Sequence, residues 1–256
     1  MKSSKANGNR GMTRSSSATR KLGAVGLIFA LTLLTSAGRS ESIRAAVILP
    51  QAMNPQQVAA SIQANAKALK TFSYQERMQV QLKGETKKVT LSQITHDMSG
   101  NEQKTQLSED PPAGAQPSGG RLKQRVVAKK TGEFKEMMQE IAALVKSYAE
   151  LPPEQLQAAL KQGSFSQGQG DMQGAIQILM RNVHQQGDSL TLWIDKEAML
   201  FRRAVIATTY EGNPVTTTAN YAMLPTGQVY MAQAILNYPK KEVVVEIDHL
   251  NYQRTQ

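Results

Sequence analysis

Hydrophobic and polar residues alternate most regularly in the C-terminal part of the chain, and this alternation predicts β-strands. Five segments show it: 189–195, 199–210, 214–224, 228–238 and 243–252. The gaps between them hold the turn-forming runs DKE, EGN, PTG and PKK. Short gaps of this kind connect antiparallel neighbours, and a meander of this length twists and curls. We therefore expect a sheet with one concave face.

A second group of strands is expected before the middle of the chain. Apolar residues alternate with polar ones from Phe72 to Leu82, which predicts a half-buried strand. Weaker patterns predict further strands at about 87–97, 102–108 and 121–130, giving about eight or nine strands in all. Stretches rich in glycine, proline or small polar residues predict flexible loops at 109–120 and 163–174.

Two segments carry a hydrophobic stripe with helical spacing. Asn54-Pro55 supplies a cap and a first-turn proline for a helix over 55–70. The stronger stripe consists of Phe134, Met137, Met138, Ile141, Leu144, Val145 and Tyr148. Burying seven such side chains is worth on the order of 10–20 kcal/mol before conformational costs, so this helix should cover an apolar sheet surface. Pro152-Pro153 is expected to end it and to start a short second helix.

The N-terminal segment predicts export. Residues 1–21 hold six Lys and Arg residues and no acidic residue, and an apolar run and small residues follow them, as in a secretory signal peptide. A run of 13 apolar residues spans about 20 Å as a helix, less than a bilayer's hydrocarbon core. We predict cleavage after Ala37, with Ala45 as the alternative, and a periplasmic location. The remainder is then a linker over 38–53 and a single domain over 54–256, with a helical insertion at about 131–162.

Composition narrows the function further. The chain has no cysteine, which excludes a lipidated N-terminal cysteine and any disulfide. Its net charge of +10 includes the six positive charges of the leader, and without them 24 Lys and Arg face 20 Asp and Glu. This is an ordinary surface, so nucleic acid is not an expected partner. The run Arg121-x-Lys123-x-Arg125 offers a transient contact with anionic lipid headgroups, with a solvated strand face as the simpler interpretation.

No pattern indicates catalysis, a metal site or a cofactor. His96, His184 and His249 lie far apart and lack the spacing of metal ligands, so we expect exposed or singly bonded imidazoles. There is no Gly-x-Ser-x-Gly motif. Gly168-x-Gly170 has no preceding predicted strand and no lysine in phosphate-loop register. The chain is therefore not expected to be an enzyme.

The turns and strands of the chain resemble the outer-membrane lipoprotein-sorting (LolA/LolB-like) superfamily of periplasmic carriers and sensors. The runs that carry the resemblance are GDSLTLWID at 187–195, TTYEGNPV at 208–215, LPTG at 224–227 and DHLNY at 248–252. The resemblance implies an α+β fold, a strongly curved antiparallel sheet (a half-open β-barrel) with an N-terminal helix and a helical lid. It also implies an apolar cavity that shields an acyl chain or a partner's hydrophobic segment.

Two functional hypotheses follow. The first is a periplasmic carrier that holds an apolar ligand, such as a lipid acyl chain or a lipidated protein, between the concave sheet and the long helix. Its candidate ligand-binding residues are Phe134, Met137, Met138, Ile141, Leu144, Val145, Met78 and Val80. Methionine adapts to varied apolar partners, although plain core packing is the simpler interpretation of the two helical methionines. The second hypothesis is an envelope scaffold or sensor that binds another protein and no small ligand.

Overall fold

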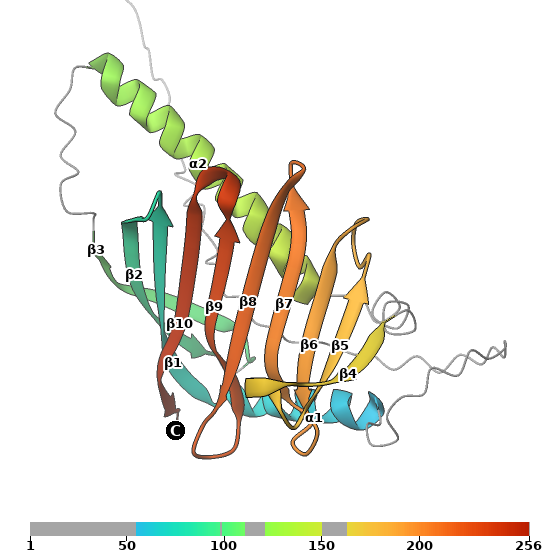
Figure 1. Cartoon of the computed structure of the whole chain (residues 1–256). Coiled ribbons are helices and arrows are strands. Elements are labelled where there is room, and N and C mark those ends of the chain that lie inside the picture. Colours follow the sequence, from blue (N-terminus) through green and yellow to red (C-terminus); the bar gives the residue numbers. More distant parts are fainter. Residues whose placement is uncertain (1–54, 98, 111–120, 150–162, 256) are drawn as a thin grey trace, which may run out of the picture.

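A ten-stranded antiparallel sheet forms the body of the protein, with two α-helices on one of its faces (Figure 1). This computed structural model describes residues 55–97, 99–110, 121–149 and 163–255. The helices are α1 (Pro55–Leu69) and α2 (Arg121–Ala149), and η1 (Gly170–Met172) and η2 (Pro239–Lys241) are single 3₁₀ turns. The strands are β1 (Phe72–Leu82), β2 (Glu85–His96), β3 (Glu102–Asp110), β4 (Ser164–Gln167), β5 (Ala175–Arg181), β6 (Ser189–Asp195), β7 (Phe201–Tyr210), β8 (Asn213–Met223), β9 (Val229–Tyr238) and β10 (Val243–Arg254).

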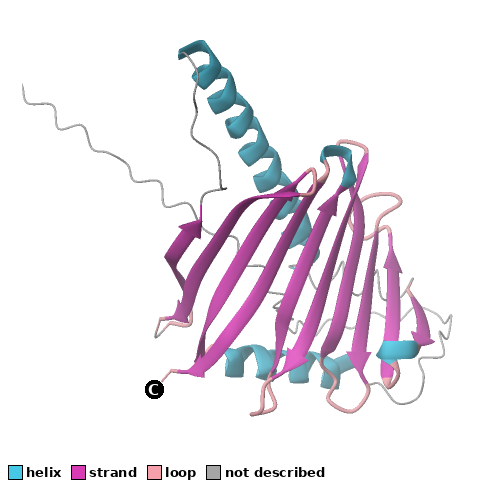
Figure 2. Ribbon diagram, turned by 60° about the vertical axis from the view of Figure 1, so that its left-hand side comes forward, coloured by secondary structure: helices cyan, strands magenta, loops and turns pink. Residues whose placement is uncertain are grey.

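The strand order joins two meanders through one long-range pairing. It runs β3-β2-β1-β10-β9-β8-β7-β6-β5-β4, so the first and last strands in sequence order lie side by side within the sheet. β1 and β10 pair from Phe72↔Arg254 to Leu82↔Val243. The sheet twists strongly and, within the described residues, β3 and β4 do not pair, so it is an open curved sheet (Figure 2).

Turn chemistry fixes the register of the meander. Between β7 and β8, Glu211 and Gly212 both have positive φ angles, of 50° and 72°, as a two-residue hairpin requires. This turn aligns Tyr210 with Asn213. Because side chains alternate between faces, that register decides which residues of both strands point inward.

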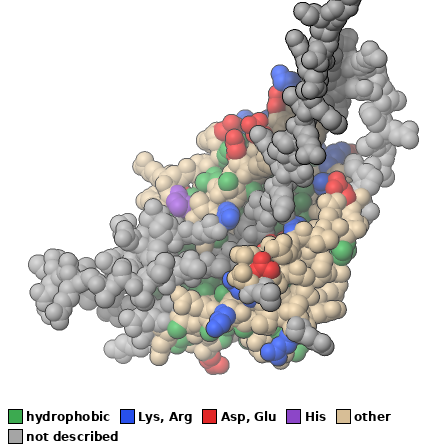
Figure 3. All heavy atoms as spheres, turned by 180° about the vertical axis from the view of Figure 1, so that it is seen from behind, with side chains coloured by type: hydrophobic (Ala, Val, Ile, Leu, Met, Phe, Trp, Pro, Cys, Tyr) green, Lys and Arg blue, Asp and Glu red, His purple; other side chains and the backbone are tan. Residues whose placement is uncertain are grey.

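One face of the sheet, called the inner face here, is apolar and carries both helices. A single row crosses seven strands in register: Ile178, Leu192, Ala204, Ala219, Ala234, Ile247 and Met78. Val58 and Ile62 of α1 and Ile141 and Val145 of α2 join the same hydrophobic core. Seen from the helix side, hydrophobic side chains remain visible between scattered charged ones (Figure 3).

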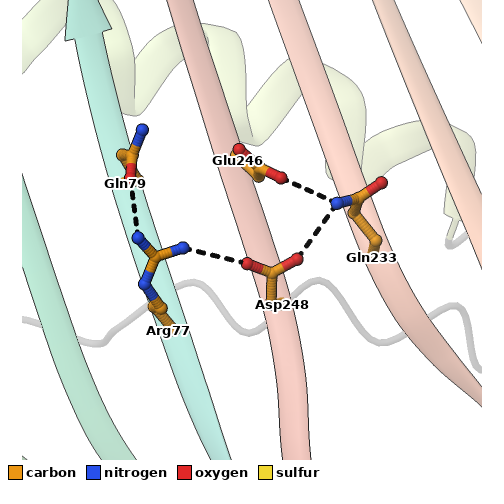
Figure 4. Close-up of polar contacts among 5 residues, drawn as sticks. All are labelled: Arg77, Gln79, Gln233, Glu246 and Asp248. Carbon is orange, nitrogen blue, oxygen red and sulfur yellow. Dashed lines mark hydrogen bonds and ion pairs between the residues drawn. The ribbon is translucent and has the colours of Figure 1, made fainter. Parts of the chain in front are cut away.

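The opposite, outer face is polar across its central strands (Figure 4). Arg77 of β1 pairs with Asp248 of β10 at 3.2 Å and donates to Gln79 at 2.8 Å. Gln233 of β9 donates to Glu246 and Asp248 at 2.7 and 3.1 Å. Partly exposed pairs of this kind add little stability. They make the outer face polar and suited to contact with water, whereas the two helices cover the inner face.

Most predicted elements are confirmed, with three corrections. The strand expected at 121–130 is the first part of α2, because the helical period continues upstream from Phe134 to Val127. The loop expected at 163–174 contains the short edge strand β4 and the turn η1. β5 was not foreseen at all, so the sheet has ten strands rather than eight or nine.

Other expectations fall on parts of the chain that lie outside the described residues. These are the signal peptide, the linker, most of the loop at 109–120 and the short helix after Pro152-Pro153. Within the described ranges, neither helix combines the length and hydropathy needed to cross a bilayer.

Candidate functional site

A cavity of about 110 Å³ lies between α1 and the inner face of the sheet. Its apolar walls come from Ile62, Ala66 and Leu69 of α1 and from Leu200, Phe201, Val229 and Met231 of the sheet side. Its remaining lining is Asn65, Lys70, Tyr74, His96, Tyr221, Tyr230, His249 and Tyr252. An apolar cavity of 150 Å³ is known to bind benzene, so this space fits a small group or the end of a larger ligand.

The side chain of Asn65 holds α1 over the cavity, because it forms the hydrogen bonds to a backbone edge that a neighbouring strand would form. The Asn65 amide donates to the carbonyl oxygen of Val229 at 2.6 Å and accepts from its N–H at 2.7 Å. Val58 and Ile62 on the same helix are buried in the core. Both hydrogen-bonding groups of the first β9 residue are therefore satisfied by α1, and this helix forms a rigid wall.

Aromatic rings form the opposite wall. Tyr74 stacks on Tyr252 with ring centroids 4.8 Å apart and lies 4.6 Å from the ring of His249. Tyr230 packs on the other side of Tyr252 at 4.4 Å. Burial, followed by nearby carboxylates and tyrosines, raises the pKa of Tyr74 and of Tyr252, so both hydroxyls stay neutral.

A cluster of charged side chains, centred on the buried Glu76, lies next to these aromatic rings. Glu76 is only 2% exposed. One of its oxygens lies 2.5 Å from Lys104 Nζ, and the other lies 3.5 Å from His249 Nε2. Burial alone would raise the pKa of Glu76, but His249 and Lys104 lower it below the usual value. Glu102 behaves oppositely, because burial and then the charge of Glu76 raise its pKa.

Of the two states expected for the histidines, exposed or singly bonded, His249 shows the second. It is 5% exposed, its hydrogen bond within the described residues is with the Tyr252 hydroxyl, and it lies directly opposite Glu76 in the β1–β10 register. The alternation along β1 could have revealed a buried carboxylate here, since Glu76 is the one charged residue among the inward-facing positions of this strand. Within the described part of the chain, histidines and carboxylates form no group that could hold a metal ion.

The predicted ligand-binding residues belong to one hydrophobic core or pack against it, six of them on α2 and two, Met78 and Val80, on β1. Ile141 and Val145 are completely buried in the core. The others are partly buried and pack against that core: Phe134, Met137, Met138, Leu144, Met78 and Val80. None of the eight lines the cavity beneath α1, which the sequence did not reveal.

The C-terminal end of α2 is anchored to the sheet by a buried hydrogen-bond network. The Tyr148 hydroxyl donates to Asp188 Oδ2 at 2.5 Å and lies 2.8 Å from Thr208 Oγ1. A second contact joins Tyr210 of β7 to Glu140 of α2. The N-terminal half of the helix stands clear of the sheet (Figure 2), so the two halves of α2 differ in how firmly they are held.

No family model matches this sequence, and no curated protein matches it. Among solved structures, the chain is similar to a LolA superfamily protein from Nitrosomonas europaea, with 8% identity and a TM-score of 0.34 over 76% of this chain and 93% of that one. It is also similar to an outer membrane lipoprotein-sorting protein domain from Vibrio parahaemolyticus, with 10% identity and a TM-score of 0.33 over 78% and 93%. A DUF1329 family protein from Desulfovibrio piger gives 13% identity and a TM-score of 0.33 over 77% and 92%.

Two of these structures carry the superfamily name indicated by the turn motifs of the sequence. These structural matches cover most of each chain, but their TM-scores are low. The candidate site is therefore defined by this chain's own residues, as a mainly apolar cavity between α1 and the inner face of the sheet.

Proposed function

We propose that this protein is an exported, periplasmic carrier that binds an apolar ligand, such as a lipid acyl chain or the acyl chain of a lipidated protein. The observation that carries the proposal is the cavity between α1 and the inner face, with its mainly apolar and aromatic lining. Withdrawing apolar area from water supplies about 25 cal/mol per Å². The role is binding rather than catalysis, with no cofactor or metal.

In this proposal α2 is the lid. Its last turns are anchored through Tyr148, whereas Phe134, Met137 and Met138 nearer the free half are only partly buried. Rotation about the anchored end would move Phe134, Met137 and Met138 away from the core without breaking the Tyr148 contacts. The cavity of about 110 Å³ that is already present would then continue into a longer apolar groove. A full acyl chain needs this additional length.

Binding can be tested on protein purified from the periplasm. Native mass spectrometry should find a bound lipid, or a fluorescent fatty acid should bind the emptied protein. The substitution Ala66→Trp places an indole into the cavity and should weaken binding about tenfold or more. Ala60→Trp is the matched control, because Ala60 is an exposed residue of the same helix outside the cavity lining. A protein that carries no lipid and binds no fatty acid would overturn the proposal.

One observation favours an envelope scaffold or sensor as the second candidate. In the described structure, β3 pairs on one side only, with β2, and Leu107 on it is 50% exposed. An open strand edge can accept a strand of another protein. Crosslinking pull-downs from the envelope separate the two functions, because a stoichiometric protein partner without any bound lipid supports the scaffold.

A further inference from the structure

The cavity beneath α1 has two chemically different sides. Phe201 of β7 and Met231 of β9 make the side toward β7 apolar. The other side carries Tyr74 of β1 and Tyr252 of β10 beside the imidazole of His249. If the proposed function is correct, a ligand that fills this space meets hydrocarbon on one side and hydrogen-bonding groups on the other.

The Tyr252 hydroxyl has unused hydrogen-bonding capacity. Tyr252 Oη lies 3.4 Å from His249 Nδ1, well beyond the usual length of about 2.8 Å for a hydroxyl donor. Tyr74 is 4% exposed and lines the cavity beside Tyr252. Buried hydroxyls normally have close partners, so both are suited to bind a polar group that enters the cavity.

The charged groups around this side are already matched in sign. Glu76 pairs with Lys104 at 2.5 Å and faces His249 at 3.5 Å. Glu102 lies opposite His96 in the β2–β3 register. An incoming anion would face the carboxylates of Glu76 and Glu102. An incoming cation would face Lys104. Lys70 also borders the cavity, but its side chain is exposed, so its charge is solvated by water. A buried ion without an unpaired counter-ion is strongly disfavoured.

We propose that the cavity takes the uncharged polar end of a neutral amphiphile, an acyl lipid that ends in a hydroxyl or ester group. The hydroxyls of Tyr74 and Tyr252 bind this polar end, and the first methylene groups lie against Phe201 and Met231. The inference rests on the proposed function and adds the ligand's headgroup class and its orientation.

Three probes with the same twelve-carbon chain test it: monolauroylglycerol, laurate and dodecyltrimethylammonium, compared by calorimetry at pH 7.5 with the full mature protein. The neutral probe should bind at least about tenfold more tightly than either ion, the difference that one good hydrogen bond makes. The double substitution Tyr74→Phe with Tyr252→Phe should remove this preference and leave laurate binding unchanged. Tyr252→Phe alone should reduce it, and serves if the double variant fails to fold.

Tyr238→Phe is the matched control, since Tyr238 is a buried inner-face tyrosine outside the cavity lining, and it should preserve the preference. Laurate or the ammonium probe binding as tightly as the neutral probe would overturn the headgroup assignment and leave the carrier function standing. Failure of all three probes to bind would overturn the carrier function itself.

Discussion

Asp188 shows how one buried carboxylate organises a loop and a helix end. It is 3% exposed and accepts hydrogen bonds from the backbone N–H groups of Val183, His184 and Gln185 at 2.6–2.9 Å. It also accepts one from the Tyr148 hydroxyl of α2 at 2.5 Å. Burial alone would raise the pKa of Asp188, but these four hydrogen bonds lower it below the usual value. The carboxylate is therefore stabilised in its charged form.

We predict that Asp188→Asn lowers the free energy of unfolding by about 2–3 kcal/mol at pH 7, since the amide cannot replace a charged acceptor of four donors. A lowered folded-state pKa means that the wild-type carboxylate stabilises the fold above the unfolded pKa of about 3.9. That contribution is lost as the pH falls through the folded value. Urea unfolding at pH 7 and at pH 3 should show the difference between wild type and variant shrinking in acid.

Asp171→Asn is the control for this measurement. Asp171 is 67% exposed and forms a surface pair with Arg203, so its loss should cost little at either pH. If both variants lost similar stability at pH 7, the network around Asp188 would not have the role assigned to it.

Glu76 and Lys104 form the buried counterpart of a surface ion pair. We predict a coupling free energy of at least about 1 kcal/mol in a double-mutant cycle of Glu76→Gln and Lys104→Gln, because either single substitution leaves a largely desolvated partner unmatched. The exposed pair Lys129–Glu133, at 3.8 Å, provides a matched cycle whose coupling should be close to zero. Chemical denaturation of the wild type and the six variants measures both, and equal couplings would contradict the prediction.

At the scale of elements, the sequence pattern predicted those strands and helices whose formation depends mainly on residues that are neighbours in the chain. The strands from β6 to β10 follow from strict alternation and turn residues, and the stripe from Phe134 to Tyr148 follows from helical spacing. The sequence pattern did not predict β4, because it is a short, polar edge strand. It did not predict the start of α2 either, because charged residues there obscure the helical period. The cavity was not predictable, because it depends on pairing β1 with β10. Positions 76 and 249 become neighbours only through that register.

The lid role of α2 can be tested with an introduced crosslink, since the chain has no cysteine. Glu140 and Tyr210 are in contact across α2 and β7, and Glu140→Cys with Tyr210→Cys can be joined by a short bismaleimide. We predict that the linked protein exchanges a fluorescent long-chain fatty acid at least about tenfold more slowly, because opening of the helix is restricted. Stopped-flow displacement measures the rate.

Each single-cysteine variant, capped with the same reagent, is the control and should exchange at the wild-type rate. Unchanged exchange in the linked protein would mean that α2 does not gate the inner face. In that case Met137 and Met138 would be core residues only, and ligand entry would have to occur beside α1.

On the scale of the whole molecule, the two faces of the sheet have separate tasks. The outer face is held by polar contacts such as those of Asp248 (Figure 4), which suit contact with water. The inner face carries both helices, the cavity and the buried Glu76 group. A ligand bound there would be shielded from the aqueous phase, and shielding is useful to a protein that crosses an aqueous compartment with an apolar cargo.

Such a role requires export, which makes the leader the last testable element. We predict that the mature protein begins at Gly38, because small residues occupy the positions that signal peptidase requires before the cleaved bond. Intact mass spectrometry of the periplasmic fraction should give this species. Ala37→Arg should block cleavage and accumulate the precursor, whereas Ala45→Arg should be processed normally. The reverse result would place cleavage after Ala45, and recovery of an unprocessed protein from the cytoplasm would remove the compartment in which the proposed carrier acts.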